Sequence, residues 1–374
     1  GTNGSVQADK QAKLSLYTLK NPPIWGQTIH KDEILAGGFS GLIYLGKNKK
    51  NNEYQFMTLT DRGANGEVLK INQIEKRPFL IPDFQVRFVK LETNSADHSL
   101  KIIDEIKLTD PKNKPILGLP QFSEGEHDEI AIDAFGKELK NSDMGVDTES
   151  LAVDKDGNYW VGEEYRPSLL KFNKNGKLIS RYIPKNGLPK NIVNKINKKY
   201  GKNVLQEKLP EVYKYRKSNR GFEGLTYFNG KIYAMLQSPI PLADSKNKKI
   251  IRILEFDPIR EVVTKEFFYP LIVDGVDKIG DLAVWNNQLI AIIQNSKTGA
   301  KSYHMITNWQ LDDKNELSEP IEKMDFAEIQ NKKLTVVPHD LINLVSIGYD
   351  FAEKIEGLAT ISENEIAVIN DNDF

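Results

Sequence analysis

The chain contains no cysteine among its 374 residues. This absence excludes disulfides, zinc sites with thiolate ligands and cysteine nucleophiles. The chain also lacks a charge bias, because 51 basic and 52 acidic residues leave a formal charge of −1. That balance argues against a general nucleic-acid or membrane-surface binder. No apolar run approaches the roughly 18 residues that a membrane-spanning helix needs.

Several catalytic signatures are missing too. The sequence contains no GxSxG elbow, Walker loop, GxGxxG fingerprint or HExxH pair. Serine hydrolase, nucleotide-binding and zincin functions therefore have no support from motifs. What the chain has instead is a recurring pattern that carries carboxylates.

The pattern is an acidic residue, a small residue, a leucine, an apolar run, a turn and a second apolar run that ends in a polar side chain. It begins at Glu149, Glu223, Asp281 and Glu356, and at Ser40 with serine in place of the acid. Each copy has the length of a β-hairpin, and Asp-Gly or Asn-Gly turns favour two-residue hairpin loops. Counting outward from the turns places Glu149 opposite Glu164, and Glu356 opposite Asp371. Carboxylates are therefore expected at one end of each hairpin.

Repeated sheet-like units indicate radial repetition around an axis, so we predict an all-β fold, a β-propeller. Five hairpin copies, with the strands at 84–108 as a further sheet, favour six blades. A tail at 1–13 precedes a single domain at 14–374. Long loop and helical insertions interrupt this domain at 110–144 and 185–219, with a helical pattern around 189–199 and a second helix expected at 338–345.

The inner strands of a propeller line its central channel, so equivalent hairpin ends form a ring at one mouth. Crowded carboxylates repel one another and raise their pKa values unless cations neutralise them. Oxygen ligands without cysteine favour Ca²⁺, or alternatively Mg²⁺. The candidate metal ligands are Asp61, Glu149, Glu163, Glu164, Glu223, Glu356 and Asp371. The alternative is that Arg62, Arg166 and Arg220 form ion pairs with these acids and that the ring holds no metal.

The sequence also indicates roles for Asp281 and His127. Asp281 lacks a matching acid at the end of its hairpin and is expected to be structural. His127 lies in the acidic stretch 124–129 and is a candidate only for protonation of a leaving group, with a solvated loop histidine as the alternative.

The sequence resembles the phytase-like family of exported bacterial proteins, whose name refers to an esterase-like activity of phytase. The resemblance runs in order from about residue 35 to the end of the chain. Its motifs are DRGAN at 61–65, GVDTE at 145–149, YWVGEEYRPS at 159–168, NRGFEGL at 219–225 and NDNDF at 370–374. It implies a β-propeller, a periplasmic or secreted location, and hydrolysis of phosphomonoesters or esters.

Two classes of function follow. In the first, a metal-dependent phosphoesterase or esterase-like hydrolase, the ring binds the metal. Arg62 and Arg220 then grip phosphate, and Glu223 acts in catalysis. A lactonase or esterase with one channel metal is a variant of this class. In the second, a non-catalytic exported propeller binds a ligand or partner, and the ion is structural. For either class we expect a monomer without a nucleic-acid partner, and for the enzyme a small phosphoester or ester substrate.

Overall fold

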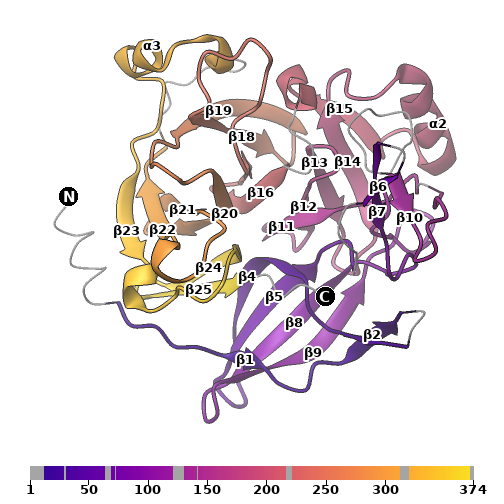
Figure 1. Ribbon diagram of the computed structural model, residues 1–374, viewed down its shortest axis with the longest axis horizontal. Helices are drawn as coiled ribbons and strands as arrows, with labels where there is room; N and C mark the ends of the chain where they lie inside the picture. The colour runs from indigo at the N-terminus through magenta and orange to yellow at the C-terminus, as the bar shows by residue number, and fades with distance from the viewer. Residues whose placement is uncertain are drawn as a thin grey trace.

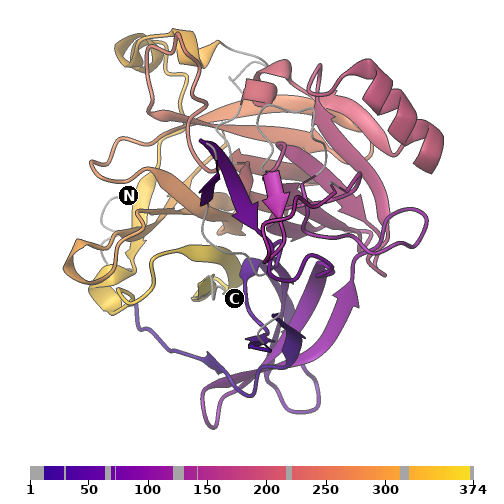
Figure 2. The same cartoon turned by 45° about the vertical axis from the view of Figure 1, so that its right-hand side comes forward.

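The protein, described here from a computed structural model, is an all-β fold with few helices (Figure 1). The described residues are 12–28, 31–63, 69–71, 73–120, 130–140, 142–215, 221–311 and 320–370. In that part of the chain, no helix is long and apolar enough to cross a membrane. The sheets stand around a common centre and give a propeller-like arrangement, which the turned view in Figure 2 also shows.

The first sheet combines the first hairpin with the strands that follow it. Its order is β1-β9-β8-β5-β4. Its strands are β1 (Thr18–Leu19), β4 (Phe39–Lys47), β5 (Tyr54–Thr60), β8 (Arg87–Asn94) and β9 (Ser99–Lys107). The expectation that 84–108 forms a separate sheet is therefore wrong, because β8 pairs directly with β5. The prediction of six blades loses this support.

Four more sheets follow in chain order, and each begins with its innermost strand. The second contains β11 (Thr148–Val153), β12 (Tyr159–Glu163), β13 (Ser168–Phe172), β14 (Leu178–Pro184) and β15 (Leu205–Leu209). The third contains β16 (Phe222–Phe228), β17 (Lys231–Leu236), β18 (Ile250–Asp257) and β19 (Val262–Pro270). The fourth contains β20 (Lys278–Trp285), β21 (Gln288–Gln294), β22 (His304–Trp309) and β23 (His339–Asn343). The fifth contains β24 (Ile355–Ser362) and β25 (Glu365–Asn370).

The inner strands pack side by side in the cyclic order β4, β11, β16, β20, β24 and back to β4. Apolar clusters fill the spaces between neighbouring sheets, including the space between the fifth sheet and the first. The leucines of the repeated pattern belong to these clusters. Leu151, Leu225, Leu282 and Leu358 are each at most 2% exposed. A buried leucine contributes roughly 1.5–3 kcal/mol, so the pattern stabilises the contacts between sheets.

In four of the five copies a small residue precedes the leucine, and at Gly224 and Gly357 it is required because the inner strands approach closely. A Cβ atom added to Gly224 would lie 2.8 Å from Cβ of Leu282 on β20. One added to Gly357 would lie 3.0 Å from the carbonyl of Gly41 on β4. Within the pattern, the acid lies in the predicted ring, the small residue allows close contact between strands, and the leucine packs between the sheets.

The remaining elements are additions to the five main sheets. A hairpin, β2 (Ile24–Gln27) and β3 (Glu33–Leu35), lies beside the first sheet in Figure 1. A small sheet in the order β10-β7-β6 includes part of the 110–144 insertion. Its strands are β6 (Leu69–Ile71), β7 (Ile74–Pro78) and β10 (Ile130–Ile132).

The insertion at 185–219 contains the predicted helix as α2 (Lys190–Tyr200). This helix buries Ile192, Val193 and Ile196 and ends at Gly201, whose φ is 128°. The same insertion supplies β15, which extends the second sheet by pairing with β14 in parallel. The other helices are α3 (Phe326–Asn331) and the short 3₁₀ turns η1 (Glu211–Tyr215), η2 (Gly299–Lys301), η3 (Ile321–Lys323) and η4 (Val345–Ile347).

The prediction of a helix at 338–345 is wrong. Residues 339–343 form β23, which pairs with β22 and completes the fourth sheet. Backbone hydrogen bonds to an open sheet edge outweighed the weak helical pattern of this short segment.

Candidate functional site

Three acids of the predicted ring, Glu149, Glu223 and Glu356, lie at β-bulges. Thr148 pairs with Glu163 and Ser150 with Gly162, which leaves Glu149 as an extra residue on β11. Glu223 is likewise skipped on β16, and Glu356 on β24. A bulge inserts an unpaired residue and re-aims its side chain, and such bulges are common beside active sites.

Because of the bulges, the register of the inner hairpins differs from the predicted one. The simple count from the hairpin turn placed Glu149 opposite Glu164, but Glu149 has no cross-strand partner and Glu164 follows the end of β12. The same count placed Glu356 opposite Asp371, whereas Glu356 is the bulge residue between two paired positions. The register was wrong because a period-two count allows no extra residue, yet the acids still converge.

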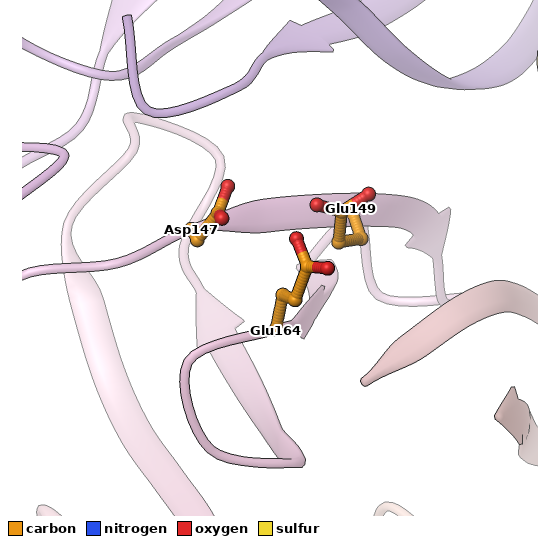
Figure 3. Close-up of side chains that lie close together, drawn as sticks. All are labelled: Asp147, Glu149 and Glu164. Carbon is orange, nitrogen blue, oxygen red and sulfur yellow. The ribbon is translucent and has the colours of Figure 1, made fainter. Parts of the chain in front are cut away.

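Two overlapping groups of carboxylates form at this end of the inner strands. The Asp147 group consists of Asp147, Glu149 and Glu164, and the Glu356 group consists of Glu149, Glu223 and Glu356. Within each group, one carboxylate oxygen per residue lies within 4.8 Å of the others. Figure 3 shows the carboxyl groups of the Asp147 group converging from β11, the segment before it and the segment after β12. Convergence was predicted for five acids, and it is confirmed for Glu149, Glu164, Glu223 and Glu356. The fifth, Asp371, lies outside the described residues.

The Glu356 group is the more deeply buried of the two. Glu223 is 1% exposed and Glu356 is 5% exposed. In each, the Oε2 atom is buried and has no hydrogen-bond partner. A buried carboxylate oxygen without a partner lowers the free energy of unfolding by about 1–3 kcal/mol or more. A proton or a cation bound at these atoms would remove that cost.

Burial and like charge both act on these acids. Burial, followed by repulsion from Glu164 and Glu223, raises the pKa of Glu149 well above its ordinary value. The pKa of Glu223 is also raised well above the ordinary value, by burial and then by the charge of Glu356. The prediction that crowded ring carboxylates have raised pKa values is confirmed for these two residues. Without a metal, Glu149 and Glu223 retain protons to higher pH than exposed glutamates do.

Arg62 is the first cation beside the ring. Its Nε atom lies 3.7 Å from Oδ2 of Asp147, and the side chain is only 10% exposed. The guanidinium stands over the rings of Phe79 and Tyr165, at 5.5 and 5.6 Å from their centroids. It also donates a hydrogen bond to the hydroxyl of Tyr165. Arg62 is therefore held inside the protein and directed at Asp147.

Lys354 is a second cation, which the sequence analysis missed. It is half-buried and precedes Glu356 by two residues. Burial opposes its charge, yet attraction from Glu356, Glu223 and the other ring acids raises its pKa above the ordinary value. The only sequence signal was this spacing, which places alternate residues of an extended chain on one side.

Glu163 lies outside both groups. It is fully buried, and Nη2 of Arg181 lies 3.3 Å from its Oε1. It also accepts hydrogen bonds from the backbone N–H groups of Asp147 and Arg166 at 3.3 and 2.8 Å. Because it accepts the hydrogen bond from the N–H of Asp147, Glu163 anchors the segment that carries Asp147.

The other expected residues have separate surroundings. Asp61 accepts a hydrogen bond from the N–H of Gly63 at 2.9 Å and belongs to neither group. Asp281 is buried and accepts hydrogen bonds from the N–H groups of Leu282 and Leu358, which ties β20 to β24. These contacts agree with the structural role expected for Asp281. The described residues do not include Arg220, Asp371 and His127.

Comparisons with known proteins agree with the resemblance seen in the motifs. An uncharacterized secreted protein of the fungus Arthroderma benhamiae is 25% identical over 298 residues, which cover 68% of this chain. The match spans 56% of that relative, so this chain corresponds to about half of its length.

Similar solved structures are more distant. The GH43 protein BlXynB of Bacillus licheniformis is 10% identical, with 78% of this chain and 44% of that chain covered at a TM-score of 0.33. A putative glycoside hydrolase of Parabacteroides distasonis is 9% identical, with 96% and 91% covered at a TM-score of 0.38. Likenesses at these scores carry no inference about activity.

The family comparison covers nearly the whole chain. The profile of the phytase-like family, described as "Esterase-like activity of phytase", matches residues 34–374. The match includes the inner strands and both carboxylate groups. The chain therefore belongs to the phytase-like family.

Proposed function

We propose that this protein is an exported, cation-dependent hydrolase of phosphoric or carboxylic esters, with its site at the two carboxylate groups. The observation that carries the proposal is the pair of buried, unpartnered Oε2 atoms of Glu223 and Glu356 beside Glu149. The family description supports ester hydrolysis, and the secreted relative supports export. Fold-level membership alone does not establish chemistry, so the site itself has to be tested.

The residues fit a hard divalent cation. The two groups offer five carboxylates, whereas Arg62 and Lys354 supply two positive charges among the described residues nearby. Fully ionised, the site would hold excess negative charge, which one or two divalent cations would offset. Ca²⁺ binds oxygen at about 2.3–2.6 Å, so ligands on opposite sides of the ion lie roughly 5 Å apart. The 4.8 Å limit within each group therefore suits Ca²⁺, with Mg²⁺ as the alternative.

In this proposal the chain's residues have distinct tasks. Glu223 and Glu356 would be cation ligands in the Glu356 group, and Glu149 would be a ligand in both groups. Arg62 would position Asp147 rather than reach substrate, because its side chain is buried between two rings. When bound, the cation would supply positive charge that polarises an ester or phosphoryl oxygen. Arg220 stays a proposed phosphate contact and Asp371 a proposed metal ligand. Asp61 and Glu163, also predicted as metal ligands, belong to neither group and are proposed to support the site.

We also propose that residues 14–374 form one propeller domain with five blades. Five inner strands in cyclic contact support this count better than six. We propose that the protein acts as a monomer on a small substrate, in the periplasm or outside the cell.

A non-catalytic role remains the second candidate. One observation favours it: the Glu356 group joins residues of β11, β16 and β24, so a single ion would tie three sheets together. Such an ion would stabilise a ligand-binding propeller without reacting with anything. Metal binding and turnover must therefore be measured separately.

The test combines metal content with hydrolysis of p-nitrophenyl phosphate and p-nitrophenyl acetate, with and without a chelator. We expect bound Ca²⁺ or Mg²⁺ and chelator-sensitive turnover, which Glu223→Gln should abolish. Glu353→Gln, at an exposed position near Glu356, is the matched control and should retain activity. Bound metal without turnover of either ester would favour the binding propeller. Absence of both would overturn the proposal.

A further inference from the structure

A cavity of about 290 Å³ lies between the second and third sheets, near the lower end of the range for small-molecule sites, about 300–1,000 Å³. Its lining comes from Lys171 on β13 and from three turns, which join β11 to β12, β16 to β17 and β18 to β19. Glu223 and Tyr227 stand four residues apart on β16, so the cavity lies roughly 13 Å along the strand from the ring. The cavity is therefore separate from both carboxylate groups.

Glu261 offers the cavity a fixed hydrogen-bond acceptor. Its Oε1 atom accepts hydrogen bonds from the hydroxyl of Tyr182 at 2.6 Å and from Nε2 of Gln206 at 3.2 Å. Tyr182 is fully buried, so this support is rigid. In the described part of the chain, Oε2 of Glu261 has no hydrogen-bond partner. A carboxylate held in this way binds a ligand with little further loss of side-chain entropy.

Lys171 offers the cavity a fixed donor. It pairs with Trp160 across β12 and β13, and its Nζ atom lies 5.6 Å from the centroid of the indole ring. Trp160 is fully buried, and its Nε1 donates a hydrogen bond to Oδ2 of Asp154 at 3.0 Å. Asp154 also accepts hydrogen bonds from the N–H groups of Asp156 and Asn158. Asp154 therefore supports the lining, whereas the ammonium group of Lys171 is held by the ring beneath it.

The cavity also has an apolar surface. Tyr227 packs partly against the buried cluster that contains Trp160, and it lines the cavity as well. Ile259, in the turn between β18 and β19, is 73% exposed although it is a large aliphatic residue. An aromatic ring and an aliphatic side chain beside a few fixed polar groups are typical of a small-molecule site.

The charges of the lining indicate the class of ligand. With Asp154 assigned to support, two carboxylates and two ammonium groups remain, from Asp156, Glu261, Lys155 and Lys171. A divalent cation would meet the two lysines, and among the described residues these acids belong to no group that could hold a metal. A phosphate would meet the two carboxylates. A neutral ligand rich in hydroxyl groups fits both signs, because a hydroxyl donates to a carboxylate and accepts from an ammonium.

We propose that this cavity binds a neutral sugar unit, either as a free saccharide or as the end of a glycan. The C–H face of the sugar ring would lie against Tyr227, and its hydroxyl groups would form hydrogen bonds with Glu261 and Lys171. This binding does not rest on the proposed ester hydrolysis, because no residue of the cavity belongs to the ring.

The ligand class is tested by saturation-transfer NMR with the methyl glycosides of glucose, galactose, mannose and N-acetylglucosamine, and by binding to an array of immobilised neutral glycans. We expect binding to at least one of these sugars. Binding to free glycosides would identify a free saccharide as sufficient, whereas binding to the array alone would identify the end of a glycan. Binding of glucose phosphate without any neutral sugar, or no binding at all, would overturn the proposal.

The location is tested by calorimetric titration with the tightest-binding of these sugars. Glu261→Gln and Lys171→Met should each weaken binding roughly tenfold or more, because each removes a hydrogen bond that involves a charged group. Tyr227→Leu should also weaken binding, because it removes the aromatic face.

Two variants serve as controls. Lys174→Met, at an exposed lysine in the turn after β13, and Glu223→Gln, in the ring, should bind the sugar as the wild type does. Thermal unfolding checks that each variant folds, and if Tyr227→Leu does not fold, the other two cavity variants decide. Full-strength binding by either Glu261→Gln or Lys171→Met would overturn the site.

Discussion

Glu223 and Glu356 bring buried carboxyl oxygens within 4.8 Å of each other from β16 and β24, two inner strands separated in the ring by β20. Neither Oε2 atom has a hydrogen-bond partner. The ring therefore concentrates uncompensated charge where three sheets meet. A fold selected for stability alone would have little reason to keep this pair, because buried acids that lack partners destabilise the native state.

A divalent cation should stabilise the protein through this pair. A ligand that binds only the folded state adds about 2.7 kcal/mol when its concentration is a hundredfold above Kd. We expect Ca²⁺ to raise the melting temperature by a few degrees, and Glu223→Gln to remove most of that rise. In chelator, Glu223→Gln should be at least as stable as the wild type because it lacks the buried charge. A melting temperature indifferent to Ca²⁺, Mg²⁺ and chelator would favour ion pairs alone.

The metal-free protein should lose stability as pH rises. The folded-state pKa values of Glu149 and Glu223 lie above the ordinary 4.5. Their contribution to stability is therefore fully present below about pH 4.5 and is lost as pH rises through the raised values. The free energy of unfolding, measured in chelator from pH 5 to 8, should fall more in the wild type than in Glu223→Gln.

The difference between the two proteins isolates this effect. Acids such as Glu92 and Asp257 have lowered pKa values and lose their stabilising contribution as pH falls. They are present in both proteins and cancel in the difference. Parallel pH profiles for wild type and Glu223→Gln would contradict the assignment. Added Ca²⁺ should flatten the wild-type profile, because the cation replaces the protons.

The sequence predicted the repeated hairpins, the all-β class and the convergence of the ring acids, which the structure shows for four of the five expected, because the acidic pattern recurs where inner strands pack. It could not predict the bulges, since one extra residue leaves the hydrophobic alternation almost unchanged. For that reason Glu163 was counted as a ring ligand, although Arg181 holds it elsewhere. The grouping of β8 with β5 was missed because sheet membership depends on long-range pairing.

A second buried charge network should control the stability of the third sheet. Arg252 contacts Glu266 at 2.5 Å and Glu322 at 2.7 Å, and all three residues are buried. Arg252→Met leaves two buried carboxylates without this partner and should cost about 3–5 kcal/mol in denaturant unfolding. The control is Lys332→Met, which removes an exposed pair with Glu328 and should cost at most about 0.5 kcal/mol. Equal costs for the two changes would contradict the burial argument.

The close approach of inner strands predicts a steric cost at Gly224. Gly224→Ala places a methyl group 2.8 Å from Cβ of Leu282 and should destabilise the protein by about 1–3 kcal/mol. The methyl group would also lie 3.1 Å from Cδ1 of Ile279 and 3.2 Å from the backbone nitrogen of Leu282, so the strand has to shift to accommodate it. Gly224→Val, which places a larger side chain in the same space, should therefore cost clearly more than Gly224→Ala in denaturant unfolding. Equal costs for the two changes would show that crowding is not the cause.

The last prediction separates the two carboxylate groups. Glu149 belongs to both, whereas Glu164 belongs to the Asp147 group alone. Glu149→Gln should therefore weaken Ca²⁺ binding more than Glu164→Gln does, by at least about tenfold, because a lost charged ligand removes more than 1.4 kcal/mol. If the protein is a hydrolase, kcat/KM should follow the same order, with far-UV circular dichroism unchanged in both variants. Equal losses would mean that the cation lies within the Asp147 group alone, and a larger loss for Glu164→Gln would contradict the shared role of Glu149.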